Sequence, residues 1–149
     1  MNERAFFRDL LGALAVSGLV VWATTRWVAV PWVVRGPSMD PALADGDRVL
    51  VDLLTLHRRT PRVGDIIVFA GPGGDDLVKR IAREPVAGDE PLPPAILAPD
   101  SPLEPTYVVL GDNLPSSSDS RAFGRVPRHR VRGRVALRYW PLSRCGPIE

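Results

Sequence analysis

One serine and one lysine stand out as residues that could do chemistry together. Ser38 lies between two prolines in the stretch GPSMDPAL. Because each proline fixes its own φ angle and restricts the residue before it, the backbone around Ser38 is expected to be stiff. Lys79 is the only lysine among 19 basic residues. A neutral lysine amine can take a proton from a serine hydroxyl, whereas arginine keeps its proton near neutral pH.

Neither residue would be convincing alone, since Gly-Pro-Ser is common in ordinary turns and a lysine on an edge strand is usually solvated. The stretch DDLVKRIAR is predicted to form a strand that places Lys79 on one face with Leu77 and Ile81. Burial between these neighbours would lower the pKa of Lys79 and favour the neutral amine. The histidines, His57 and His129, are each flanked by arginines that favour solvent exposure and disfavour the imidazolium of a working triad.

A third polar stretch, GDNLPSSSDSR, begins where a predicted buried strand, YVVL, ends. Its serines carry hydroxyls that can hydrogen-bond a lysine amine, and Asp119 with Arg121 can form a bidentate ion pair. A serine-rich loop is more often only a loop. Here, however, it accompanies Ser38 and Lys79 in one short chain.

Together the three stretches resemble the type I signal peptidases, membrane-anchored serine endopeptidases that remove signal peptides from exported proteins. GPSMDPAL is similar to the family's nucleophile segment, RVGDIIVF followed by LVKRI to its base segment, and GDNLPSSSDSR to its serine-rich loop. The resemblance implies that Ser38 is the nucleophile, that Lys79 is the general base and that Ser117 orients this base. It gives supporting roles to Gly111, Asp112, Asn113, Asp119 and Arg121, and substrate contacts to Gly36, Pro37 and Met39.

The resemblance also implies an acyl-enzyme mechanism without a cofactor. Lys79 would deprotonate Ser38 and later activate water, while the backbone N–H of Ser38 would help to stabilise the oxyanion. Some members have a serine two residues before the nucleophile as a second donor, but this chain has Gly36 there, which leaves that donor unidentified. Members favour small residues at the first and third positions before the cleaved bond, as in Ala-X-Ala. Signal-peptide-bearing preproteins are therefore the expected partners.

The composition predicts a mostly β fold. The chain of 149 residues has room for about one domain, and its 16 Pro and 13 Gly favour short strands and turns. The resemblance implies antiparallel sheets in a catalytic domain over residues 31–149, and we expect a monomer. With one cysteine, Cys145, and two histidines, no His/Cys metal site of the usual kind is expected.

The first 30 residues are predicted to form a short N-terminal tip and a membrane anchor. Residues 10–25, LLGALAVSGLVVWATT, carry no charge, and a single transmembrane helix from about residue 6 to 27 approaches the roughly 20 residues that spanning requires. Arg4 and Arg8 precede it, which predicts a cytoplasmic N-terminus and a catalytic domain outside the plasma membrane. A buried core helix and a cleavable signal peptide are two other interpretations of the same residues.

Other functions fit parts of the sequence. A dedicated maturation protease or a conjugation-type peptidase would share the Ser-Lys chemistry. Self-cleaving repressors of the DNA-damage response use it too, but carry a DNA-binding domain in place of an apolar N-terminal run. A membrane-tethered binding module would contact anionic lipid or nucleic acid through the stretch RVPRHRVRGRVALR, whose arginines at 128, 130, 132 and 134 would line one strand face. The net charge of +2 gives no separate reason to expect a nucleic-acid partner.

Overall fold

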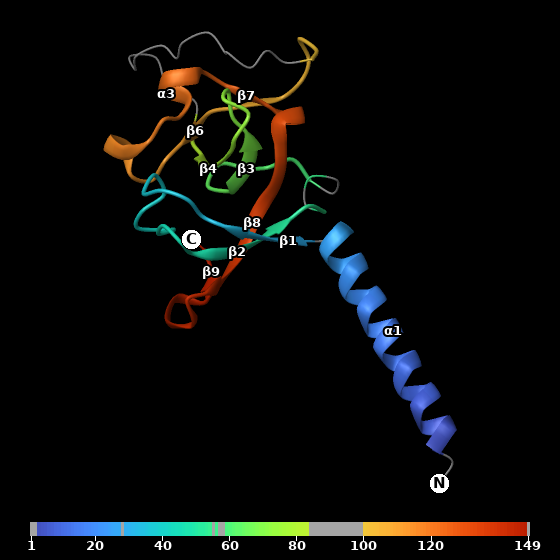
Figure 1. Ribbon diagram of the computed structural model, residues 1–149. Coiled ribbons are helices and arrows are strands. Elements are labelled where there is room, and N and C mark those ends of the chain that lie inside the picture. The colour runs from blue at the N-terminus through green and yellow to red at the C-terminus, as the bar shows by residue number, and fades with distance from the viewer. Residues whose placement is uncertain (1–2, 28, 55, 57–58, 84–99, 149) are drawn as a thin grey trace.

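The computed structural model describes residues 3–27, 29–54, 56, 59–83 and 100–148, and Figure 1 shows a β-rich domain with one helix projecting from it. The helix is α1 (Glu3–Trp27), and it leads into the first strand. The strands are β1 (Ala29–Val33), β2 (Arg48–Asp52), β3 (Ile66–Ala70), β4 (Asp76–Ile81), β5 (Thr106–Tyr107), β6 (Val109–Leu110), β7 (Val126–Pro127), β8 (Val131–Trp140) and β9 (Gly146–Pro147). Short helical turns are η1 (Leu114–Ser116), α3 (Ser120–Phe123), η2 (Arg128–Arg130) and η3 (Leu142–Arg144). Most of the proline-rich stretch over residues 91–105 lies outside the described residues.

The strands form one seven-stranded sheet in the order β1-β2-β8-β3-β4-β6, with β9 beside β8, and a separate pair β5-β7. The described pairings are antiparallel, so the mostly β, antiparallel fold predicted from the sequence is confirmed. β8, ten residues long, pairs with β2, β3 and β9 and crosses the whole domain in Figure 1. The stretch VRGRVALRYW forms this strand.

The sheet is packed on both of its faces. β3 is the clearest case, because Ile66 and Val68 belong to one buried cluster whereas Ile67 and Phe69 belong to another. All four of these side chains are at most 4% exposed. Strands buried on both faces read as continuous apolar runs, which is what IIVF shows. β4 lies directly beside β3, so its side chains enter a well-packed environment.

The basic stretch before the C-terminus does not form one strand face as predicted. Arg128 and Arg130 lie in η2, because the chain makes a single 3₁₀ turn after Pro127 before β8 begins. Of these four arginines, only Arg132 and Arg134 share a face of β8. Both form ion pairs: Arg132 Nε lies 2.5 Å from Asp76 Oδ1, and Arg134 Nη1 lies 3.7 Å from Asp65 Oδ1. Much of the basic character of the strip is thus compensated within the domain.

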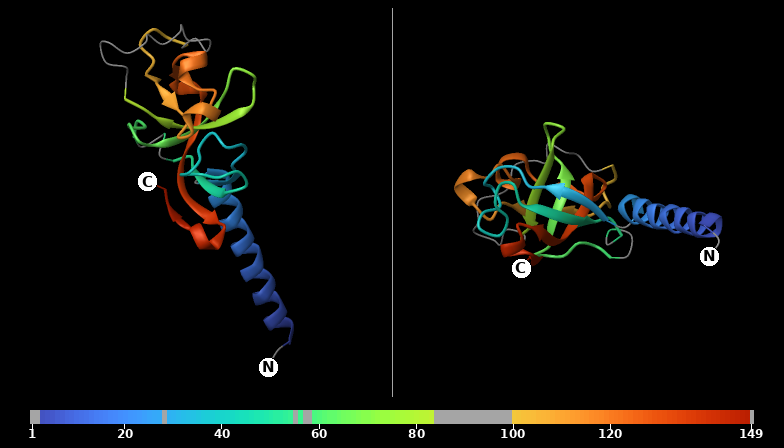
Figure 2. Two further views of the ribbon diagram at one scale, coloured as in Figure 1. Left: turned by 90° about the vertical axis from the view of Figure 1, so that its left-hand side faces the viewer. Right: turned by 60° about the horizontal axis from the view of Figure 1, so that its bottom comes forward.

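The N-terminal helix leaves apolar side chains exposed. Leu11, Leu14, Val16 and Leu19 are 65%, 61%, 63% and 63% exposed, and both views of Figure 2 show α1 pointing away from the β domain. Across the residues that the structure describes, there is no helix whose length and apolar character suffice for a membrane span.

Candidate active site

Ser38 and Lys79 lie in contact although 41 residues separate them in the sequence. Ser38 stands in the turn that follows β1, and Lys79 lies on β4. The distance between Lys79 Nζ and Ser38 Oγ is 2.7 Å, which is a short hydrogen bond. The arrangement brings a hydroxyl and an amine together with no intervening group, the geometry that proton transfer from serine to lysine requires.

Lys79 is buried in apolar surroundings. Its side chain is 3% exposed, it lies opposite Ile67 on β3, and it shares its strand face with Leu77 and Ile81 as the alternation predicted. Burial therefore holds the pKa of Lys79 below its ordinary value of 10.5, while the nearby charge of Asp119 acts in the opposite direction and is outweighed. A larger fraction of Lys79 is neutral near physiological pH than for a solvated lysine.

The turn that carries Ser38 is held on two sides. Gly36 adopts a φ of 79°, a left-handed conformation that favours glycine, and its N–H donates to Asp45 Oδ1 at 2.8 Å. On the other side, the backbone N–H of Asn113 donates to the carbonyl of Ser38 at 3.0 Å. Gly36 thus provides the left-handed conformation that the turn requires, and the loop of residues 111–113 lies directly against Ser38.

The serine-rich loop is organised by a buried carboxylate. Asp119 is 0% exposed and accepts hydrogen bonds from Arg121 Nε and Nη2, both at 2.9 Å, so the bidentate pair predicted from the sequence is present. It also accepts from the N–H of Gly111 at 3.1 Å. Burial acts to raise the pKa of Asp119, but the hydrogen bonds from Arg121 and Gly111 outweigh it and hold the pKa below its ordinary value. Asp119 is therefore ionised and fixes the start of the loop.

Gly111 permits the loop to approach Ser38 closely. A β-carbon at this position would lie 2.5 Å from the carbonyl oxygen of Ser38 and would also overlap the side chain of Ser117. The Ser117 hydroxyl is buried and makes no hydrogen bond of ordinary geometry among the described residues, but it lies near enough to Asp119 to help lower the pKa of that carboxylate. The described residues include no hydrogen bond between Ser117 and Lys79, so the orienting role that the resemblance gives Ser117 remains a prediction. A hydroxyl has both a donor and acceptor lone pairs, so its place beside Asp119 still leaves it able to accept from a lysine amine.

Replacing Gly111 with alanine is expected to lower kcat/KM by roughly 10- to 100-fold, because the added methyl group must displace the Ser38 carbonyl or Ser117. Peptide-bond cleavage by the purified variant would measure this effect. Gly73→Ala is the matched control, since a β-carbon there meets no atom closer than 4.0 Å. Full activity in Gly111→Ala would show that the loop does not need to be this close to Ser38.

A cavity of about 480 Å³ contains the dyad. Residues 32–35, 38 and 39 line one side and residues 75–79 the other, so Met39 borders the cavity, whereas Gly36 and Pro37 do not. Among the described residues, β4 pairs with β6 only at Arg80 and Ile81. The part of β4 that precedes them therefore presents a strand edge to the cavity. An extended peptide could add to this edge by main-chain hydrogen bonds.

Comparison with known proteins places this site in a family. Residues 7–90 and 103–140 match the family described as signal peptidase, peptidase S26. A signal peptidase IB of Staphylococcus aureus (strain Mu50) is 31% identical over 170 residues, covering 88% of this chain and 88% of the relative. The mitochondrial inner membrane protease subunit 1 of Xenopus tropicalis is 34% identical over 146 residues, covering 94% of this chain and 86% of the relative. The chain belongs to the signal peptidase family.

Family membership confirms two predictions made from the sequence. The protein is a serine-type endopeptidase, and the signal peptidase relatives support signal peptidase I activity. It also confirms the resemblance drawn from the three short stretches, because the matched residues include Ser38, Lys79 and the loop from Gly111 to Arg121.

An ion pair next to the signal peptidase dyad was not predicted. Arg80 follows Lys79 on β4, and its Nε and Nη2 donate to the two oxygens of Asp112 at 2.9 and 2.8 Å. The resemblance gives Asp112 a supporting role but does not name Arg80 as its partner. The pair forms because β4 and β6 lie side by side, with Arg80 opposite Leu110. Arg80 and Asp112 are 32 residues apart, so no local pattern indicates their contact. It links the strand of Lys79 to the loop that contacts Ser38.

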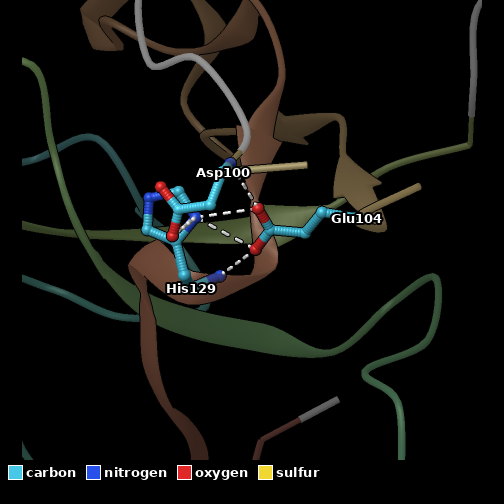
Figure 3. Close-up of side chains that lie close together, drawn as sticks. All are labelled: Asp100, Glu104 and His129. Carbon is cyan, nitrogen blue, oxygen red and sulfur yellow. Dashed lines mark hydrogen bonds and ion pairs between the residues drawn. The ribbon is translucent and has the colours of Figure 1, made fainter. Parts of the chain in front are cut away.

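A second polar cluster lies at η2, away from the signal peptidase dyad, and Figure 3 shows its members Asp100, Glu104 and His129. Glu104 accepts from the backbone N–H groups of His129 at 2.6 Å and Asp100 at 2.9 Å, and its oxygens lie 3.0 and 2.9 Å from His129 Nδ1. These hydrogen bonds join residues 100–104 to η2, which gives the cluster a structural role. His129 is exposed and engaged there, while His57 lies outside the described residues.

Proposed function

We propose that this protein is a signal peptidase I that uses Ser38 as nucleophile and Lys79 as general base. Its substrates are exported preproteins, which it cleaves after small residues to release the signal peptide. The observation that carries the proposal is the 2.7 Å contact between Lys79 Nζ and Ser38 Oγ, made by a lysine that is 3% exposed. Family membership supports the reaction class.

The reaction proceeds by acyl transfer. Neutral Lys79 accepts the proton of the Ser38 hydroxyl while Ser38 Oγ attacks the carbonyl carbon of the scissile bond. The protonated lysine then gives this proton to the leaving amine, which releases the mature protein and leaves the signal peptide as an ester on Ser38. Lys79, neutral again, takes a proton from water as the water attacks the ester. It then gives this proton to Ser38 Oγ as the ester bond breaks, which releases the signal peptide and restores the Ser38 hydroxyl. The backbone N–H of Ser38 donates to the oxyanion in both halves of the reaction.

The cavity wall beside the dyad is apolar. Beside the dyad, Val34 is 1% and Met39 1% exposed, and Val78 on the opposite wall is 9% exposed. They give the cavity an apolar wall beside the dyad, which suits small apolar residues such as the alanines of the expected Ala-X-Ala sites. The substrate lies extended along the edge of β4, with the residues before the scissile bond in this apolar part of the cavity.

The loop residues support the dyad without reacting themselves. Asp119 and Arg121 hold the loop, and Asn113 binds the Ser38 carbonyl. Asp112 holds the loop to β4 through Arg80. We assign to Ser117 the task of hydrogen-bonding the Lys79 amine as it changes protonation state, because its buried hydroxyl makes no hydrogen bond of ordinary geometry among the described residues and lies beside Asp119, whose charge acts on Lys79.

A dedicated maturation protease is the second candidate, because one relative is a mitochondrial inner membrane protease subunit. The two candidates differ in substrate range rather than in chemistry. The binding-module interpretation is less well supported, since Arg132, Arg134 and Arg138 of the basic stretch each meet a carboxylate of the domain.

The test is cleavage of several unrelated preproteins, each with an Ala-X-Ala site, by the detergent-purified protein. A signal peptidase I cuts most of them at that site and fails when the last alanine is replaced by leucine. Cleavage of a single preprotein would favour the dedicated protease. Complete inactivity, or cleavage that ignores the leucine substitution, would contradict the proposal.

We also propose that α1 anchors the protein in the plasma membrane, with the N-terminus cytoplasmic and residues 31–149 outside. Its exposed leucines and valines and its projection from the β domain support this placement. We expect the full chain to float with liposomes of neutral and anionic lipid at high salt, and a chain lacking residues 1–30 to lose at least tenfold of that binding. Equal flotation of the two chains would contradict the anchor, as would a full chain that stays in the soluble fraction.

A further inference from the structure

A buried ion-pair network joins the C-terminal segment to the loop that follows Ser38. Asp47, 3% exposed, ends this loop, and its Oδ2 lies 3.1 Å from Arg138 Nη1 and 3.4 Å from Arg144 Nη1. The same oxygen accepts from the backbone N–H of Ala44 at 3.0 Å. Arg138 comes from β8 and Arg144 from η3, so two basic residues from the end of the chain converge on one carboxylate near its beginning.

Both arginines also bind the backbone of the loop directly. Arg138 Nη1 donates to the carbonyl of Ala42 at 2.7 Å, and Arg144 Nη2 donates to that of Pro41 at 2.8 Å. These acceptors lie three and four residues after Ser38. A further hydrogen bond, from Arg138 Nε to the backbone carbonyl of Arg144 at 2.6 Å, ties the Arg138 side chain to the backbone of η3. One guanidinium therefore serves three acceptors in a fixed planar fork, which a lysine ammonium cannot reproduce.

Backbone hydrogen bonds and apolar packing are further restraints on this loop. Its base is closed where Val34 N–H donates to the carbonyl of Asp47 at 2.9 Å and Gly46 N–H to that of Val34 at 3.0 Å. Inside it, Leu43 N–H donates to the carbonyl of Met39 at 2.8 Å. These bonds fix the loop onto itself and onto β1, and the side chains of Met39 and Leu43 pack in the apolar cluster that includes Val135 of β8. Among the described residues, Arg138 of β8 and Arg144 of η3 add the polar links between the middle of the loop and the C-terminal segment.

We propose that Arg138 and Arg144 are positioning residues that hold Ser38 at Lys79 through Asp47 and the carbonyls of the loop. This inference rests on the proposed function. Ser38 and Lys79 lie on separate segments, so their 2.7 Å contact depends on whatever fixes the Ser38 loop relative to the sheet. Asn113 holds the loop at the Ser38 carbonyl, and the arginine network holds it on the C-terminal side of the serine. Loss of the network moves the hydroxyl away from the amine without touching either group.

The test compares Arg138→Met, Arg138→Lys and Arg144→Met in the full chain. Methionine keeps the apolar stem of arginine and deletes its cation and donors. Arg59→Met is the matched control, because Arg59 likewise pairs with a carboxylate, that of Asp65 at 2.8 and 3.1 Å, at a place that does not contact the Ser38 loop. Arg144 is 37% exposed in its side chain, so its variant remains informative where Arg138→Met fails to fold.

Two readouts are taken below the melting temperature of each variant. In Arg138→Met, kcat for preprotein cleavage is expected to fall roughly 10- to 100-fold with KM little changed, since misplacement of reacting groups acts on the chemical step. Arg138→Lys should recover little of this loss, and Arg144→Met should lose less. Hydrogen exchange at the amides of Leu43 and Gly46 should accelerate in Arg138→Met and Arg144→Met but not in Arg59→Met.

Parent kcat in folded Arg138→Met and Arg144→Met would overturn the positioning role, and so would an equal loss of kcat in Arg59→Met. Unchanged amide exchange in both Arg138→Met and Arg144→Met would show that the two arginines do not restrain the Ser38 loop. The exchange measurement does not depend on activity. If the parent chain cleaves no preprotein but amide exchange still accelerates in the arginine variants, the proposed function is wrong, whereas the restraint of the Ser38 loop by Arg138 and Arg144 is supported.

Discussion

Replacing Ser38 with alanine is expected to lower preprotein cleavage by roughly 10³- to 10⁶-fold, because no other hydroxyl contacts the Lys79 amine among the described residues. The substitution removes one hydroxyl and one hydrogen bond from a half-buried site. It should therefore change the free energy of unfolding by no more than about 1.5 kcal/mol. Initial rates on an Ala-X-Ala preprotein and a thermal melt would measure the two quantities on the same sample.

The result that identifies Ser38 as the nucleophile is a large loss of cleavage with little change in the free energy of unfolding. Ser116→Ala is the comparison, since Ser116 lies exposed in η1 of the same serine-rich loop and should keep parent activity. Retention of more than about a tenth of the parent rate in Ser38→Ala would remove Ser38 from the role of nucleophile, because loss of a true nucleophile costs several orders of magnitude.

Replacing Lys79 with methionine should abolish cleavage to the same degree and leave the protein equally or more stable. The methionine side chain fits between Leu77 and Ile81 and has no amine to desolvate, whereas the native lysine is buried at a cost to its charged form. Lys79→Arg should be equally inactive, because a guanidinium stays protonated. Cleavage rates and denaturant unfolding of the three proteins measure both effects.

The pH dependence of stability gives a second reading of Lys79. Because the folded pKa of Lys79 lies below its ordinary value of 10.5, the unfolded chain binds the extra proton between these two values. The free energy of unfolding contributed by Lys79 therefore rises as pH increases across that window. This contribution should be missing from Lys79→Met. Identical pH dependence in parent and variant would show that the buried amine is not perturbed.

The local parts of the site could be predicted from the sequence. Prolines on both sides of Ser38, alternation around Lys79 and the short spacing of Asp119 and Arg121 are all signals within a few residues. Each gave a geometric expectation that the structure reproduces: a held turn, a buried lysine and a bidentate pair. Nothing local indicated how near Ser38 and Lys79 would be, and that expectation came from family resemblance.

The contacts that connect distant strands could not be predicted in this way. The pairs Arg80–Asp112 and Arg138–Asp47 span 32 and 91 residues, and each depends on which strands become neighbours in the sheet. The error over Arg128 and Arg130 has a related cause. Alternating arginines fit a strand, but the chain makes one 3₁₀ turn in η2 before β8 begins. Periodicity over so few residues cannot distinguish a strand from such a turn.

The measurement that tests the Ser-Lys mechanism most directly is the pH dependence of kcat/KM for one Ala-X-Ala preprotein. A neutral Lys79 must accept the serine proton, and burial lowers the pKa of its amine. The rate should therefore rise with pH through an apparent pKa below 10.5 and then reach a plateau as the amine becomes fully neutral. A rate that is independent of pH up to 10.5, or that falls as pH increases, would contradict Lys79 as the base.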